Sequence, residues 1–245
     1  MGFWSSVGSF ISGCASTIGS VIRSVGSAVG GFAGSAIKAV SNLVPVLSKW
    51  AGNIGIAVQV IGIVIDVVSK ILNIIKEHET VPDIGERALQ AEEQGITLES
   101  CDNDFDAYME KIRNIKLNPQ RTHQSHEQWL AGSLLLEKGL EQKYPNMCTS
   151  AMWPIIVRNA DFFTKERMAA YAQVAMEKNV PFGESIAKYF TPRTNSRIDI
   201  ATNDYLKEAE KRFNPRATPN DIIDEFHRVK ANCAGADREN NKPSM

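Results

Sequence analysis

Apolar residues recur at alternating steps of three and four over the first 32 residues, which is the pattern of a stripe along one face of a helix. Small residues beside the stripe are also periodic, and Gly26, Gly30 and Gly34 form a GxxxGxxxG row. The apolar stripe consists of Trp4, Val7, Ile11, Cys14, Ile18, Val21, Val25, Ala28 and Phe32, and a row of serines runs through Ser12, Ser16, Ser20 and Ser24.

Rows of small residues let two helix backbones approach closely, and in a bilayer such packing replaces the hydrophobic drive for association. In water, each glycine lowers helix stability by about 1 kcal/mol relative to alanine. The pattern therefore predicts a helix that packs in a membrane, with the three zipper glycines and Ser12, Ser16 and Ser20 as helix-packing contacts.

A second apolar stretch runs from Trp50 to Ile75, and Pro45 before it predicts a turn or kink. Residues 50–65 carry no charge. A strand rarely exceeds ten residues, whereas about 20 apolar residues in a helix span a bilayer. The two stretches therefore predict an apolar, Gly-rich helical hairpin. Its membrane-inserting residues are expected to be Ile54, Val58, Ile61 and Ile65.

Two charges make insertion of the second stretch marginal. Its fourteen Ile, Val and Leu residues favour insertion by about 6 kcal/mol in all. Asp66 and Lys70 oppose insertion by about 2.5–3.5 kcal/mol each at mid-membrane, and their spacing suits a helical ion pair. Trp4 and Trp50 begin the two stretches, where they are either interfacial anchors or residues packed on the protein's own core.

Composition changes abruptly after residue 76. Residues 1–76 carry a net charge of +4 and residues 77–245 a net charge of −5, so the chain divides into a glycine-zipper membrane-inserting segment and a soluble helical domain. Periodicity and capping signals predict an all-α fold. The candidate helices of the second part are Asp83–Gln94, Asp104–Leu117, Ser125–Tyr144, Thr164–Lys178, Gly183–Phe190, Arg197–Phe213 and Pro219–Cys233.

Signatures of catalysis are absent from the sequence. No nucleotide-binding, hydrolase, metalloprotease or EF-hand motif occurs. His123 and His126 lack a further metal ligand, so they indicate a polar helix start. Two clusters of acidic residues are better interpreted as solvated first turns of helices than as catalytic acid–base pairs. The clusters are Asp102, Asp104 and Asp106, and Asp221, Asp224 and Glu225. We expect no catalytic residue, cofactor or metal, and no nucleic-acid partner, because basic and aromatic residues are not interleaved.

Cysteine spacing and the chain start indicate the compartment. Cys14, Cys101, Cys148 and Cys233 are far apart, which favours reduced thiols in a cytoplasmic protein. No basic residue precedes Arg23, so a secretory signal is not predicted.

The apolar stretch needs a cover in water, because its aliphatic residues would form a patch larger than soluble monomers tolerate. One candidate cover is the protein's own domain, through the faces that carry Trp129, Leu134, Leu136 and Leu140. The other is a carrier protein.

With its Gly26-x3-Gly30-x3-Gly34 zipper, its Trp50–Ile75 stretch and its acidic helical remainder, the chain resembles pore-forming antibacterial effectors of the type VI secretion system. The resemblance implies a toxin secreted from the producer's cytoplasm without a signal peptide. It would form an ion-permeable pore in the target cell's inner membrane and depolarise that membrane. Implied partners are membrane lipid, other copies of the chain, a secretion-tube ring protein or chaperone, and a cognate membrane immunity protein.

The alternative is a soluble helical adaptor or scaffold whose N-terminal hairpin docks a protein partner. Liposome leakage separates these two functions, because only a pore-former releases the contents of a vesicle.

Overall fold

The computed structural model describes residues 16–51, 53–118, 125–191 and 200–240, and each regular element within them is a helix, as the all-α prediction requires. Short 3₁₀ turns lie at η1 (Glu99–Cys101), η2 (Pro145–Met147) and η3 (Ser150–Met152). The α-helices are α2 (Ser16–Gly31), α3 (Ala36–Trp50), α4 (Ile54–Ile71), α5 (Val81–Glu93), α6 (Phe105–Arg113), α7 (His126–Lys143), α8 (Trp153–Arg158), α9 (Lys165–Lys178), α10 (Phe182–Phe190), α11 (Ile200–Phe213) and α12 (Pro219–Asn240).

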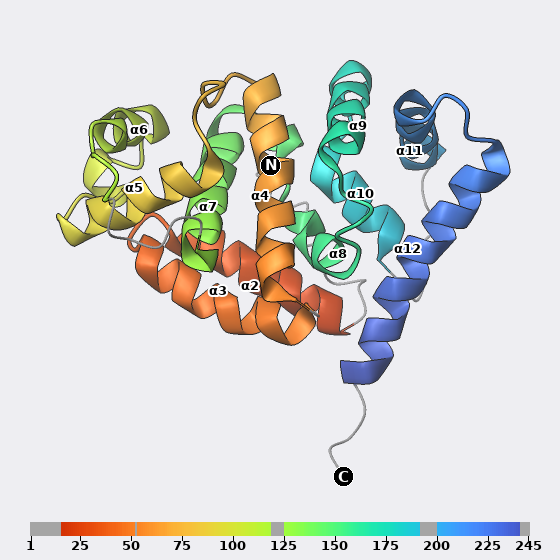
Figure 1. The fold of residues 1–245 in the computed structure, drawn as a ribbon, viewed down its shortest axis with the longest axis horizontal. Helices are drawn as coiled ribbons and strands as arrows, with labels where there is room; N and C mark the ends of the chain where they lie inside the picture. The colour runs from red at the N-terminus through yellow and green to blue at the C-terminus, as the bar shows by residue number, and fades with distance from the viewer. Residues whose placement is uncertain (1–15, 52, 119–124, 192–199, 241–245) are drawn as a thin grey trace, which may run out of the picture.

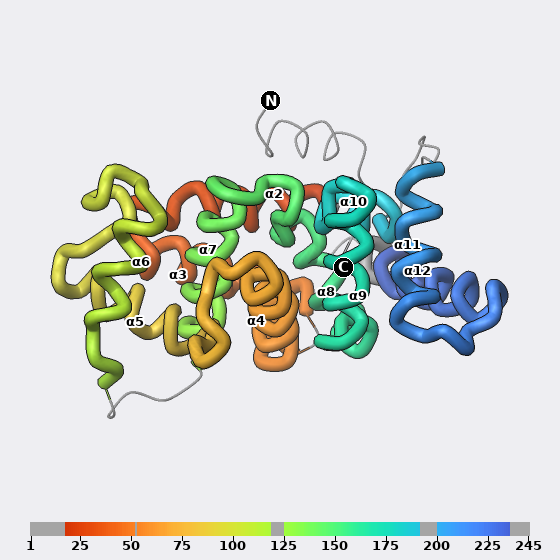
Figure 2. The backbone as a smooth tube through the Cα atoms, turned by 90° about the horizontal axis from the view of Figure 1, so that it is seen from above, coloured from red at the N-terminus to blue at the C-terminus, as the bar shows by residue number. Residues whose placement is uncertain are grey.

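Helices α4 and α7 stand side by side in the middle of the molecule (Figures 1 and 2). Helices α2 and α3 pack against each other and form a layer across one end of this central pair. Helices α5 and α6 lie on the α7 side, while α8 and α9 pack on the α4 side and lead to α10, α11 and α12 (Figure 2). Helix α4 is thus placed between elements from later in the chain.

The periodic stripe of the first helix is confirmed where the structure describes it. Its members in α2 and the following turn are all buried, and Ile22 and Val29 extend the same face. This face packs on α3, α7, α8 and η3. The buried stripe members are Ile18, Val21, Val25, Ala28 and Phe32, and the earlier members Trp4, Val7, Ile11 and Cys14 lie outside the described residues.

The chain turns about ten residues earlier than predicted. Helix α3 continues through Pro45, so the predicted turn at this residue is wrong. Pro45 lies on the exposed side of α3, where water can satisfy the carbonyl group that loses its N–H partner. The reversal instead lies at residues 32–35, and the side chain of Ser35 caps α3 by accepting from the N–H of Lys38. Residues 16–71 are therefore three helices, and the two-helix hairpin is not confirmed.

Glycines allow close packing at other positions than the predicted zipper. A Cβ atom on Gly85 of α5 would lie 1.9 Å from the backbone carbonyl oxygen of Gln128, and one on Gly132 of α7 would lie 2.0 Å from that of Val81. A Cβ on Gly62 of α4 would lie 2.2 Å from the Trp129 ring. The α5–α7 and α4–α7 contacts thus depend on these three glycines.

A single apolar core crosses the change of composition at residue 76, since its members extend from Ile18 in α2 to Cys233 in α12. Polar contacts also join the two parts. The carboxylate of Glu92 in α5 accepts hydrogen bonds from the Ser35 hydroxyl and from the N–H of Ile37, at the start of α3. In this structure the amino-acid composition thus changes between 1–76 and 77–245, but the hydrophobic core continues across this boundary. Residues 16–76 share one core with the later helices.

Candidate functional site

Helix α4 is the described helix long and apolar enough to cross a membrane, and half of it is buried within the protein. The side chain of Asn53 caps its first turn by accepting from the N–H of Ile56. Its inner face packs on α7, α8 and α9. Of the predicted inserting residues, Val58, Ile61 and Ile65 lie on this inner face and are fully buried, whereas Ile54 is partly exposed.

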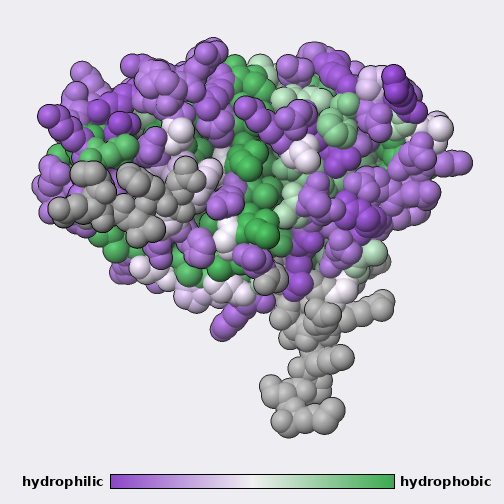
Figure 3. Space-filling view, in the orientation of Figure 1, coloured by the Kyte–Doolittle hydropathy of each residue, from purple (hydrophilic) through white to green (hydrophobic). Residues whose placement is uncertain are grey.

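The outer face of α4 is mostly apolar and meets solvent, with Gln59 exposed among its aliphatic residues. Ile56 is 52% exposed, and Val60 and Ile63 are partly exposed along the same helix. Figure 3 shows a hydrophobic band down the middle of the molecule, where Figure 1 places α4, with hydrophilic surface on both sides. We call this band, formed by Ile54, Ile56, Val60 and Ile63, the α4 face. It is the largest departure from a polar surface in that view.

Asp66 and Lys70 form the ion pair that their spacing suggests, with Nζ of Lys70 2.8 Å from a carboxylate oxygen of Asp66. The two side chains are 17% and 28% exposed, respectively. An ion pair at such a partly exposed position on α4 contributes little to the stability of the fold in water. Its effect on insertion into a membrane stays a prediction.

Trp50 lies in the core. Its side chain is 2% exposed, its Nε1–H donates to the carbonyl oxygen of Pro154 at 2.7 Å, and the Arg158 guanidinium lies 4.7 Å from the ring centroid. Of the two alternatives for Trp50, an interfacial anchor or a core residue, this fold shows the core residue. Trp50 can reach a membrane interface only if α3 moves. The other predicted anchor, Trp4, lies outside the described residues.

The central zipper glycine, Gly30, makes no tight helix contact in this fold. A Cβ on Gly30 would meet nothing within 4 Å, Gly26 is partly exposed, and Gly34 lies in the α2–α3 turn. Ser20 is exposed on α2. Ser12 lies outside the described residues, and Ser16 begins α2. Gly30 thus has room for contacts that the folded monomer does not make.

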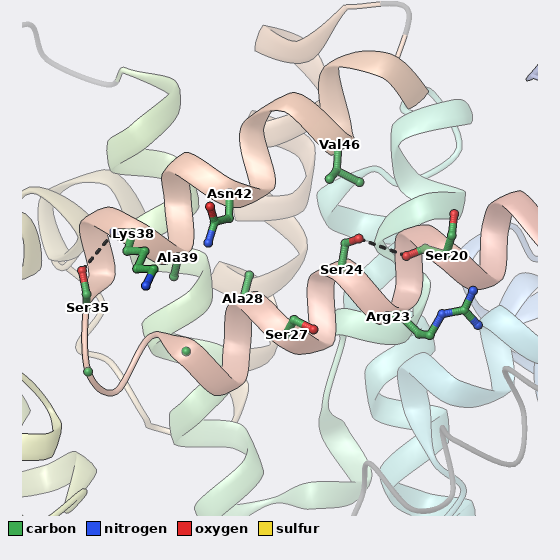
Figure 4. Close-up of a pocket in the computed structure, with 12 residues that line it drawn as sticks. Ser20, Arg23, Ser24, Ser27, Ala28, Ser35, Lys38, Ala39, Asn42 and Val46 are labelled. Carbon is green, nitrogen blue, oxygen red and sulfur yellow. Dashed lines mark hydrogen bonds between the residues drawn. The ribbon is translucent and has the colours of Figure 1, made fainter.

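A groove of about 700 Å³ opens between α2 and α3 (Figure 4). Ser24 and Ala28 of α2 face Lys38, Asn42 and Val46 of α3 across it. The lining residues are mostly small or polar; they are Ser20, Arg23, Ser24, Ser27, Ala28, Gly31, Gly34, Ser35, Lys38, Ala39, Asn42 and Val46.

The carboxylates considered for acid–base chemistry mostly act as caps and ion-pair partners. Asp104 accepts from the N–H of Ala107 at the start of α6, and Asp106 pairs with Lys143. Asp221 accepts from Thr218, and this hydrogen bond lowers its pKa. In the described ranges no three His, Cys, Asp or Glu residues cluster as a metal site.

The two histidines and the cysteines are not brought together. His126 is exposed at the start of α7, and His123 lies outside the described residues. Cys101, Cys148 and Cys233 are each buried, and none of these three is in a disulfide. Burial raises the pKa of the Cys148 thiol well above its usual value, so this thiol stays protonated at neutral pH.

Sequence reasoning missed a fully buried carboxylate. Glu137 of α7 accepts from the N–H of Thr149 at 2.9 Å, from the Thr149 hydroxyl at 2.8 Å and from the N–H of Ser150 at 2.8 Å. Burial raises its pKa, and these hydrogen bonds oppose the rise. The available signal was a glutamate directly after Leu134, Leu135 and Leu136, although Lys138 beside it suggests a solvated position. Glu137 fixes the 148–153 segment, and thus the start of α8, to α7.

Comparison of this chain with protein-family models, with curated proteins and with solved structures gave no match.

Proposed function

We propose that this protein is a pore-forming antibacterial toxin that stores its membrane-spanning helix, α4, in a soluble helical fold. The observation that carries the proposal is the half-burial of α4. Its inner face is covered by α7, α8 and α9, whereas its outer face is an apolar band on the surface. An apolar helix exposed along one side can contact a bilayer before the rest of its cover opens.

The free energies involved are balanced. Insertion of residues 51–75 is close to neutral when the Asp66 and Lys70 penalties are set against the aliphatic gain. The folded state covers Val58, Ile61 and Ile65 within the core. This cover adds its own stabilisation to the soluble state, so α4 leaves it only where membrane contacts replace those of the core.

The resemblance to type VI secretion effectors completes the proposal. The toxin leaves the producer's cytoplasm without a signal peptide, carried by a ring protein or chaperone, and acts at the target's inner membrane. A membrane immunity protein protects the producer. Because α7, α8 and α9 already bury the inner face of α4, the carrier needs to shield only the α4 face.

Ile56→Asp is expected to reduce dye release from liposomes about tenfold or more, because a carboxylate near the end of a spanning helix opposes insertion. The folded state should be unaffected, since Ile56 is half exposed. The matched control is Ile200→Asp on α11, where the isoleucine is 79% exposed but lies on a different helix. Equal leakage from the two variants at equal protein concentration would contradict insertion of α4.

Gly30→Leu is expected to lower leakage and toxicity while leaving the fold intact. The side chain enters open space in the monomer, and leucine favours helix by about 1 kcal/mol over glycine. In a membrane the same side chain separates helices that meet through the zipper. Thermal unfolding and liposome cosedimentation serve as controls: the unfolding temperature should be unchanged or raised, and cosedimentation should be unchanged. If the variant is as toxic as the wild type at equal expression, the zipper is not a helix contact within the pore.

The second candidate function is an adaptor that docks a protein partner. The shared core of residues 16–76 and the rest favours it, because such a fold can present the α4 face without opening. Depolarisation of cells that express the protein in the periplasm, compared with the cytoplasm, tests the choice. An adaptor leaves the membrane potential unchanged in both compartments.

A further inference from the structure

The groove between α2 and α3 is longer than its main cavity. A second cavity of about 280 Å³ shares Ser20, Ser24 and Val46 with the first and extends it to Lys49 and Trp50. The groove thus runs from the turn at Gly34 to the end of α3. Only residues 51–53 separate its far end from the start of α4.

The charged residues that line the groove are all basic. Arg23, Lys38 and Lys49 are exposed and line it, and α2 and α3 contain no acidic residue. Within the described part of the chain, none of these three cations forms an ion pair. The nearby carboxylates Glu92 and Glu99 lie at the turn end, where Glu92 is hydrogen-bonded to Ser35 and Ile37.

We infer that the α2–α3 groove binds the phosphate headgroups of an anionic lipid surface and so docks the protein before α4 inserts. Three unpaired cations suit phosphate oxygens, which accept charge-assisted hydrogen bonds from ammonium and guanidinium groups. This inference rests on the proposed membrane activity, and it adds the class of lipid that the protein recognises.

The position of the groove favours a bilayer over an acidic protein. Lys49 and Trp50 end α3, and Ile54 and Ile56 of the α4 face follow within one short connection. A lipid interface offers anionic headgroups beside hydrocarbon. The headgroups match the basic groove, and the hydrocarbon matches the adjoining α4 face. An acidic polypeptide would pair with the cations but would leave the adjoining apolar face exposed.

The test compares the full-length protein with the variant Arg23→Gln/Lys38→Gln/Lys49→Gln in cosedimentation. The vesicles contain phosphatidylcholine alone or phosphatidylcholine with one third phosphatidylglycerol. Each cation near an anionic surface contributes roughly fivefold to partitioning, so the triple variant is expected to bind the anionic vesicles about a hundredfold more weakly. Binding of the wild type should also weaken as salt is raised.

A matched control removes three exposed lysines outside the groove, in the variant Lys111→Gln/Lys116→Gln/Lys165→Gln. Its net charge equals that of the groove variant, so a general charge effect would weaken both alike. Circular dichroism checks that each variant remains folded, which we expect because all six side chains are exposed.

Four outcomes would overturn the inference. They are equal binding of wild type to neutral and anionic vesicles, undiminished binding by the groove variant, equal losses in the groove and control variants, and binding to polyglutamate but not to vesicles. The last outcome would assign the groove to an acidic protein. Selective vesicle binding without dye release would support the lipid site and contradict pore formation, so the two proposals fail separately.

Discussion

Gly85→Ala is expected to lower the free energy of unfolding by at least about 3 kcal/mol, although it adds a single methyl group. The new Cβ would lie 1.9 Å from the backbone carbonyl oxygen of Gln128 and 2.6 Å from the backbone nitrogen of Gly132. Backbone atoms within a helix cannot rotate away, so α5 and α7 must separate. Chemical denaturation monitored by circular dichroism measures the loss.

The same substitution at Gly30 is the control. The Cβ there meets nothing within 4 Å, and alanine favours helix over glycine by about 1 kcal/mol. Gly30→Ala should therefore be neutral or stabilising, while Gly85→Ala is destabilising. A change of the same sign and size at both positions would mean that α5 and α7 do not pack as closely as described.

Glu137→Ala should lower the free energy of unfolding by about 3–5 kcal/mol. The substitution leaves the N–H groups of Thr149 and Ser150 and the Thr149 hydroxyl without an acceptor in a buried site, and it opens a cavity. Because Thr149 also accepts from Nε1 of Trp153, the start of α8 should loosen. Hydrogen exchange across residues 148–158 measures this loosening.

Glu137→Gln separates the charge from the shape of this side chain, since it keeps one acceptor oxygen and nearly the same volume. It should lose less stability than Glu137→Ala. Burial raises the pKa of Glu137 above its usual value of 4.5, so the folded state holds this proton more tightly than the unfolded state. The stability from this group is complete below pH 4.5 and is lost as pH rises through the folded pKa.

The measurement for this pH dependence is the difference in unfolding free energy between wild type and Glu137→Gln, taken from pH 4 upward. We expect wild type to lose stability relative to the variant over this window. A constant difference would mean that Glu137 does not titrate with folding.

Local signals predicted the helices well because several begin at residues that cap them. Ser125 and Thr164 accept from the N–H groups of Gln128 and Arg167, and Pro219 is the first residue of α12. Each cap satisfies orphan N–H groups within a few residues of the same segment. Helix α8 was missed because six residues are too few for a periodic pattern to appear.

The partners of each face could not be predicted in the same way. The stripe from Ile18 to Phe32 indicates a buried face. The same periodicity is expected whether α3 and α8 cover this face or another helix covers it in lipid. Gly85 and Gly132 lie 47 residues apart and belong to no GxxxG row, so their contact depends on how α5 and α7 cross. The half-burial of α4 likewise depends on helices that follow it in the chain.

The order of α4 and its cover along the chain has a consequence in time. Residues 54–71 are synthesised first, and the covering helices α7, α8 and α9 follow only at residues 126–178. At about 5–20 residues per second, the ribosome adds the missing hundred or so residues in roughly 5–20 s. During this interval the producing cell holds an apolar helix whose cover does not yet exist, and a chain that terminates before residue 126 never acquires it.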